Sequence, residues 1–123
     1  MTVLLLALAG GVGAAVRFVV DGLVRERLKT AFPWGTVAIN ISGSLLLGLL
    51  AGFVMRGHAP ESLMLVLGTG FLGGYTTFST ASLETVRLVQ SGRTALAVIN
   101  ALGTMVVSVL AAAAGVSISL LMP

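Results

Sequence analysis

Long uncharged stretches divide the chain into four apolar segments. Residues 30–55, 62–83 and 94–123 contain no charged side chain, and residues 1–16 form a fourth stretch that ends at Arg17. The first three stretches exceed the roughly 20 apolar residues that a helix needs to cross the hydrocarbon core of a bilayer. The pattern predicts one domain over residues 1–123, with four transmembrane helices at Thr2–Val20, Trp34–Met55, Ser62–Val89 and Arg93–Leu121.

The third segment is interrupted by a polar decapeptide, GGYTTFSTAS, at residues 73–82. Its two glycines weaken a helix, and the hydroxyls of Thr76 and Thr77 compete for backbone hydrogen bonds. Backbone groups freed at membrane depth are tolerated only where they are buried in protein or line a cavity. The pattern therefore predicts a third helix broken at its centre, with freed carbonyls of the kind that bind cations in membrane proteins.

The same decapeptide supplies groups that suit an anion. Phe78 projects from the expected break, and the edge of its ring carries positive partial charge. Ser79 and Thr80 follow with hydroxyl donors. A small, hard anion could meet the ring edge and these hydroxyls.

Composition supports a membrane protein over a soluble one. Hydrophobic residues make up 57% of the chain and charged residues 9%, whereas soluble domains carry roughly a quarter charged residues. The absence of cysteine excludes disulfides and thiol chemistry. The basic residues form no nucleic-acid patch, and those of the first loop (Arg25, Arg27 and Lys29) are typical juxtamembrane charges that face lipid headgroups. No Ser/His/Asp set, paired carboxylates or metal cluster supports an enzyme.

Small residues recur at spacings that let helices pack closely, as at Gly10/Gly13 and Gly48/Gly52. Four helices of this length enclose little volume, so an oligomer is expected. The charges of the loops favour both termini outside, because only Arg56 lies near the ends on the side of the termini. That bias is moderate and permits mixed insertion.

A few polar groups inside the predicted helices require an explanation, since such groups are costly in a bilayer. Asn40 could form an interhelical hydrogen bond, or its side-chain amide could donate to an anion. Arg17 fits either a helical ion pair with Asp21, four residues on, or a cation that draws anions into a vestibule. Glu84 is expected to pair with Arg87 or Arg17.

The fourth segment carries one polar stripe, because Asn100, Thr104 and Ser108 recur every four residues. Thr and Ser alone would usually bond back to their own helix. Three polar residues in register indicate a wet or partner-facing side.

Three motifs give the chain a resemblance to a known family. They are GxxGAxxR at residues 10–17, FPWGTxAxNxxG at 32–43 and TGFLGGxTTFST at 69–80, the last followed by Glu84. These motifs run over most of the chain and resemble the Fluc (CrcB) family of fluoride channels. The resemblance implies an all-α membrane protein of four helices per subunit, assembled as an antiparallel, dual-topology dimer with two fluoride pores along its interface.

The resemblance also assigns roles to residues. It implies that Asn40 lines the pore, that Phe78 is the first phenylalanine of an aromatic box, and that Ser79 and Thr80 belong to a polar track. Arg17 matches the vestibule arginine, and Thr104 and Ser108 match polar positions of the fourth helix, whereas Asn100 stands where a tyrosine is frequent. The carbonyls of Gly73 and Thr76 would supply half of a structural Na⁺ site, completed by a second subunit across the two-fold axis.

The chain departs from the family pattern at Ala81, where a second phenylalanine is expected. The loss of this ring removes one edge donor and opens a gap. Three explanations are open: a natural variant with a reduced aromatic box, one half of a heteromeric pair, or an engineered replacement of phenylalanine by alanine.

The function expected from these features is passive export of fluoride across a bacterial or archaeal plasma membrane. An alternative is a small four-helix, proton-coupled exporter of lipophilic cations, but residues 1–16 lack the carboxylate that such transport requires in the first helix. A membrane scaffold without transport would explain the glycines but not the hydroxyl-rich break or Asn40.

Overall fold

A computed structural model describes all 123 residues, and its regular elements are all helices. The first two spans are α1 (Thr2–Arg27) and α2 (Trp34–Met55). The third span consists of α3 (Glu61–Leu63), the π-helical η1 (Met64–Leu72), α4 (Gly73–Tyr75) and, after a break, α5 (Ser79–Gln90). The fourth span consists of α6 (Thr94–Val98), the π-helical η2 (Ile99–Gly103) and α7 (Thr104–Leu121).

The predicted spans are confirmed. Three continuous helices, Thr2–Arg27, Trp34–Met55 and Thr94–Leu121, are long and apolar enough to cross a membrane, and the third span is interrupted near its middle. The first helix continues beyond the predicted end at Val20 to Arg27. Its extra turns are supported by an ion pair between Asp21 and Arg25, which lie four residues apart with Oδ2 and Nε separated by 3.0 Å.

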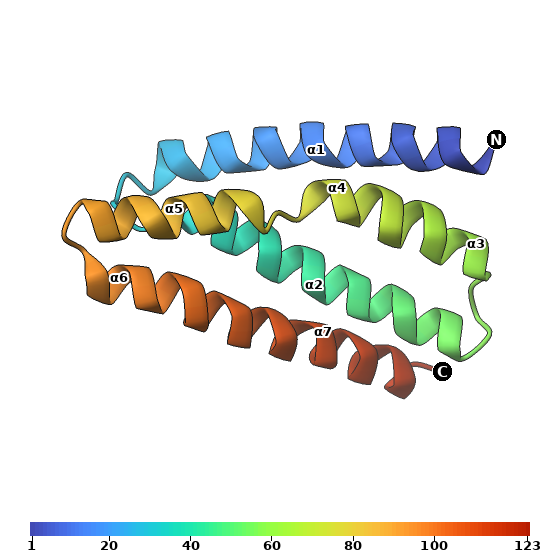
Figure 1. The fold of residues 1–123 in the computed structure, drawn as a ribbon. Coiled ribbons are helices and arrows are strands. Elements are labelled where there is room, and N and C mark those ends of the chain that lie inside the picture. The colour runs from blue at the N-terminus through green and yellow to red at the C-terminus, as the bar shows by residue number, and fades with distance from the viewer.

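The four spans lie side by side, with both termini at one end and the α1–α2 loop and the α5–α6 turn at the other (Figure 1). α2 packs along α7, and α1 packs against η1 and α4. Both contacts depend on glycine: a Cβ on Gly48 would overlap the carbonyl of Ala112, and one on Gly74 would overlap the backbone of Gly10. The small-residue spacings therefore mark helix contacts, as predicted.

The chain keeps few apolar side chains inside. Ile39, Leu72 and Tyr75 form the one buried apolar cluster, while large apolar residues such as Phe18 and Val109 are exposed along the outer faces of the helices. An exposed apolar surface of this extent would be unfavourable in water. It suits a multi-pass protein whose helices face lipid.

Candidate ion pathway at the helix break

The third span breaks at Thr76–Phe78. The helix ends at Tyr75, the backbone of Thr76 is extended (φ −77°, ψ 158°), and a new helix begins at Ser79. Gly73 and Gly74 are themselves helical, so of the two features expected to weaken the helix, the glycines and the hydroxyl residues, the break falls at the hydroxyl residues. The small size of Gly74 serves the contact with α1, and the hydroxyl residues that follow carry the break.

Asn40 on α2 holds the broken segment through both ends of its amide. Its Oδ1 accepts the backbone N–H of Thr77 at 2.8 Å, and its Nδ2 donates to the Thr77 carbonyl at 2.9 Å. In a continuous α-helix the Thr77 N–H would instead be donated to the Gly73 carbonyl, four residues earlier. The side chain of Asn40 therefore frees the carbonyl of Gly73. It is an interhelical hydrogen-bonding residue, and one of its amide N–H groups has no acceptor within the chain.

Thr77 frees a second carbonyl. Its Oγ1 accepts the backbone N–H of Thr80 at 3.1 Å, as a capping hydroxyl does at the start of a helix. In a continuous helix that N–H would go to the carbonyl of Thr76. The Thr76 carbonyl instead accepts a long hydrogen bond, 3.4 Å, from Nη1 of Arg17.

The two freed carbonyls, those of Gly73 and Thr76, are the pair that the sequence resemblance assigned to Na⁺. Carbonyls of unwound helices are ligands that suit a hard cation. The donor set therefore fits, although Arg17 brings a positive charge to one of the two oxygens.

A groove of about 600 Å³ runs beside the break, between α2, the third span and the fourth span. Of the residues assigned to the site from sequence, seven line it: Asn40, Gly73, Thr76, Phe78, Ala81, Thr104 and Ser108. Three others, Arg17, Ser79 and Thr80, do not. The hydroxyl oxygen of Ser108 is buried and has no hydrogen-bond partner within the chain. The lining of the groove thus includes a buried hydroxyl that no group of the chain binds.

Phe78 points away from its own chain, because 88% of its surface is exposed. An aromatic ring at this depth faces either lipid or a neighbouring protein. Ser79 beside it is also exposed, and its Oγ lies 3.4 Å from Oγ1 of Thr77. The break therefore presents a ring and a hydroxyl on the outside of the single chain.

Ala81 lies next to a polar network that joins the third and fourth spans. Nδ2 of Asn100 donates to Oγ1 of Thr85 at 2.8 Å, and that hydroxyl donates to the Ala81 carbonyl at 2.8 Å. Asn100 is 3% exposed, and it lines the groove together with Thr85 and Ala81. The position without a second phenylalanine ring is thus bordered by an amide and a hydroxyl.

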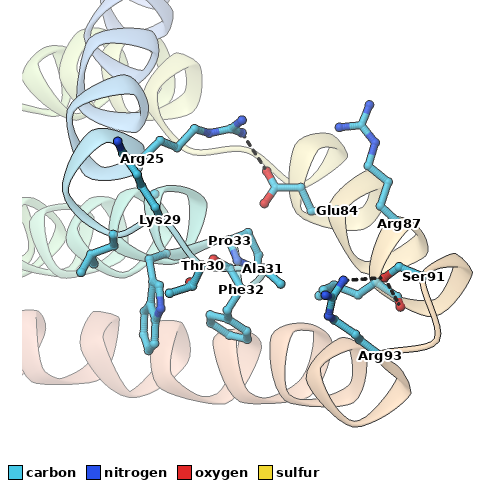
Figure 2. Close-up of a pocket in the computed structure, with 14 residues that line it drawn as sticks. Arg25, Lys29, Thr30, Ala31, Phe32, Pro33, Glu84, Arg87, Ser91 and Arg93 are labelled. Atoms are coloured by element: carbon cyan, nitrogen blue, oxygen red, sulfur yellow. Dashed lines mark hydrogen bonds and ion pairs between the residues drawn. The ribbon is translucent and has the colours of Figure 1, made fainter.

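The charged residues pair differently from the expectation. Oε1 of Glu84 accepts a 2.6 Å hydrogen bond from Oγ1 of Thr36 and lies 3.8 Å from Nη2 of Arg25 (Figure 2). The predicted pairing of Glu84 with Arg87 or Arg17 is wrong, and of the two alternatives for Arg17 the ion pair with Asp21 is not formed. The extension of α1 accounts for both outcomes, because it brings Arg25 within reach of the two carboxylates.

Comparisons with known proteins place the chain in a family. The family model described as "CrcB-like protein, Camphor Resistance (CrcB)" matches residues 4–116. The chain belongs to the CrcB family. The fluoride-specific ion channel FluC 1 of Leifsonia xyli subsp. xyli is 46% identical over 94% of this chain and 84% of its own length. The fluoride-specific ion channel FluC of Novosphingobium aromaticivorans is 49% identical, over 91% and 90% of the two chains.

A third relative in the CrcB family, the fluoride-specific ion channel FluC 1 of Streptomyces avermitilis, is 48% identical over 91% of both chains. The family predicted from the motifs at residues 10–17, 32–43 and 69–80 is therefore confirmed, and all three motifs lie within the matched region.

Sequence reasoning missed several residues of this CrcB site. Thr77 was recognised as a helix breaker, but not as the partner of Asn40 or as the cap of α5. Thr36 and Thr85, which bond Glu84 and Asn100, were not singled out. The adjacent threonines at 76 and 77 were a usable local signal. No sequence signal pairs residues on different spans, such as Thr36 and Glu84.

Proposed function

We propose that this protein is a fluoride-specific channel that lets F⁻ leave the cytoplasm passively through a bacterial or archaeal plasma membrane. Its CrcB relatives, named as fluoride-specific ion channels, support the choice of ion. The observation that carries the proposal is the pair of hydrogen bonds between Asn40 and the backbone of Thr77 at the break, beside a groove that Asn40, Thr104 and Ser108 line. A transmembrane scaffold would not need a break of this kind.

The proposed fluoride path replaces water by donors from this chain. Fluoride is strongly hydrated, so its dehydration must be offset by N–H, O–H and ring-edge contacts along the path. Asn40, which has one free amide N–H, lines the same groove as Thr104 and Ser108. Phe78, Ser79 and Thr80 continue the path from the break, and the Arg17 guanidinium attracts anions toward it.

The proposed assembly is an antiparallel dimer with two pores. The exposed ring of Phe78 and the exposed hydroxyl residue Ser79 beside it support a second copy, because a hydroxyl at membrane depth is better covered by protein than by lipid. A related chain could take the place of that copy in a heteromeric pair.

The carbonyls of Gly73 and Thr76 would hold a structural Na⁺ at the two-fold axis of this dimer, with the same pair from the second copy. Bound there, Na⁺ would supply a positive charge that offsets the repulsion of an anion by its low-dielectric surroundings. Asn40 and Thr77 maintain this arrangement, since their hydrogen bonds keep both carbonyls out of the helical ladder.

No observation favours the proton-coupled exporter of lipophilic cations. That mechanism requires a titratable carboxylate on the transport path. Glu84 does not line the groove, and it is held by Thr36 and Arg25 at the loop end of the bundle.

The experiment is anion efflux from liposomes that contain the purified chain. We expect fluoride efflux well above protein-free liposomes, and chloride efflux close to that background. Ala81→Phe should raise the fluoride rate, because it restores a ring edge beside the groove. Ala7→Phe adds the same ring on an exposed face of α1 and serves as the control. Equal fluoride and chloride rates would refute the proposed selectivity.

A further inference from the structure

A second pocket, of about 420 Å³, lies at the loop end of the bundle and shares no lining residue with the groove. Four of the seven basic residues of the chain line it: Arg25, Lys29, Arg87 and Arg93. The only carboxylate in its lining is that of Glu84. In a chain with so few charges, this concentration of positive side chains around one cavity makes it a candidate anion site.

The four cations come from segments that are distant in sequence (Figure 2). Arg25 and Lys29 lie at the end of α1 and in the loop that follows, whereas Arg87 and Arg93 lie on α5 and after the α5–α6 turn. Arg25 is already paired with Asp21 and Glu84. The other three form no salt bridge and are exposed, so three positive charges around the cavity lack a counter-charge within the chain.

The pocket also has an apolar part. The rings of Phe32 and Trp34 pack with their centroids 4.7 Å apart, and Leu28 and Leu88 complete the apolar lining. Trp34 begins α2 and remains 45% exposed. Tryptophan is enriched at the level of the lipid headgroups, and the ends of the spans place this pocket at the same depth. An occupant therefore meets cations and an apolar surface together.

We propose that this pocket binds the phosphate of an anionic phospholipid headgroup. Guanidinium and ammonium groups donate charge-assisted hydrogen bonds to phosphate oxygens. Basic pockets between membrane helices are known to accept acidic headgroups. The volume lies within the range of small-ligand sites, roughly 300–1,000 Å³. Free phosphate would use the same cations, but the aromatic and leucine side chains add contacts only for the glycerol and acyl parts of a lipid.

Native mass spectrometry of the detergent-solubilised protein, titrated with phosphatidylglycerol or phosphatidylcholine, tests the proposal. The variants are Arg87→Gln and Arg93→Gln, both at exposed positions where loss of folding is not expected. Arg27→Gln is the matched control, because it removes an exposed charge nearby that does not line the pocket. Inorganic phosphate at the same molar concentration is added as a competitor in a separate arm.

We expect phosphatidylglycerol to bind more tightly than phosphatidylcholine. Each pocket variant should weaken binding of phosphatidylglycerol by about fivefold, and Arg27→Gln by less than about twofold. Inorganic phosphate should not displace the lipid. If Arg27→Gln and Arg87→Gln weakened binding of phosphatidylglycerol equally, the proposal would be overturned in favour of general charge attraction. Displacement by inorganic phosphate would overturn it in favour of a soluble-anion site, and equal binding of both lipids would exclude headgroup recognition.

Discussion

The side chain of Asn40 holds the third span open at its break. It exchanges two hydrogen bonds with the backbone of Thr77, at 2.8 and 2.9 Å, and thereby takes the N–H that a continuous helix would return to Gly73. No other residue of α2 contacts the break through hydrogen bonds to its backbone. The chemistry of the break therefore depends on an amide contributed by a different span.

We predict that Asn40→Ala abolishes most fluoride efflux while the protein still folds. Each lost hydrogen bond is worth about 1 kcal/mol net, and the freed Thr77 N–H can then bond to the Gly73 carbonyl and close the helix. Liposome efflux measures the loss, and circular dichroism checks the fold. Ser117→Ala is the control, because Ser117 is exposed on α7 and does not line the groove. A wild-type rate in Asn40→Ala would contradict the role assigned to the amide.

At the scale of single residues, the sequence predicted which polar groups matter better than it predicted their partners. Asn40, Thr104 and Ser108 were identified because polar groups are rare in membrane spans, and all three line the groove. The ion pairs were predicted wrongly. Partners such as Arg25 and Glu84 meet only because α1 and α5 end at the same level of the bundle, and helical spacing within one segment does not contain that information.

At the scale of helices, hydropathy predicted all four spans, and the polar decapeptide at residues 73–82 predicted the break, which falls inside it at Thr76–Phe78. Only the contribution of Gly73 and Gly74 was predicted wrongly, since both stay helical. Glycine lowers helix propensity in any context. In a membrane bundle, however, its lack of a side chain is also what permits close packing. One sequence does not show whether a glycine weakens its helix or lets it pack closely. Here Gly74 permits α4 to pack against α1, and the helix continues through it.

We predict that Gly74→Ala destabilises the contact between α1 and α4, whereas Gly11→Ala does not. A Cβ at position 74 would overlap the backbone of Gly10, while one at position 11 meets open space. Overpacking of this kind costs about 1–3 kcal/mol, and the added helix propensity returns at most about 1 kcal/mol. Thermal unfolding in detergent measures both variants. Equal midpoints for the two would show that α1 and α4 do not approach as closely as described.

At the scale of the whole molecule, the proposed fluoride path lies on an open side of the single chain. Its helices expose apolar side chains over their outer faces, and Phe78 and Ser79 point outward from the break. The groove lies open between α2, the third span and the fourth span. A second copy would cover these groups. An antiparallel arrangement additionally requires that one sequence inserts in both orientations.

We predict that both ends of the bundle are found on both sides of the membrane. The chain has no cysteine, so a single new one reports its own location. His58→Cys marks the end that carries the termini, and Ser91→Cys marks the opposite end; both positions are exposed. In intact cells a membrane-impermeant maleimide should label about half of each variant, because the few loop charges give only a moderate orientation bias.

Permeabilised cells should label both cysteine variants fully, and the cysteine-free parent should remain unlabelled. These two controls define full and zero labelling. Full labelling at one position together with none at the other would contradict dual topology. An antiparallel pair of identical chains would then be impossible, because every copy would cross the membrane in the same direction. An antiparallel partner at the open groove would then have to be a different chain, and Ala81 would be interpreted within a heteromeric pair in which the second subunit supplies the missing ring.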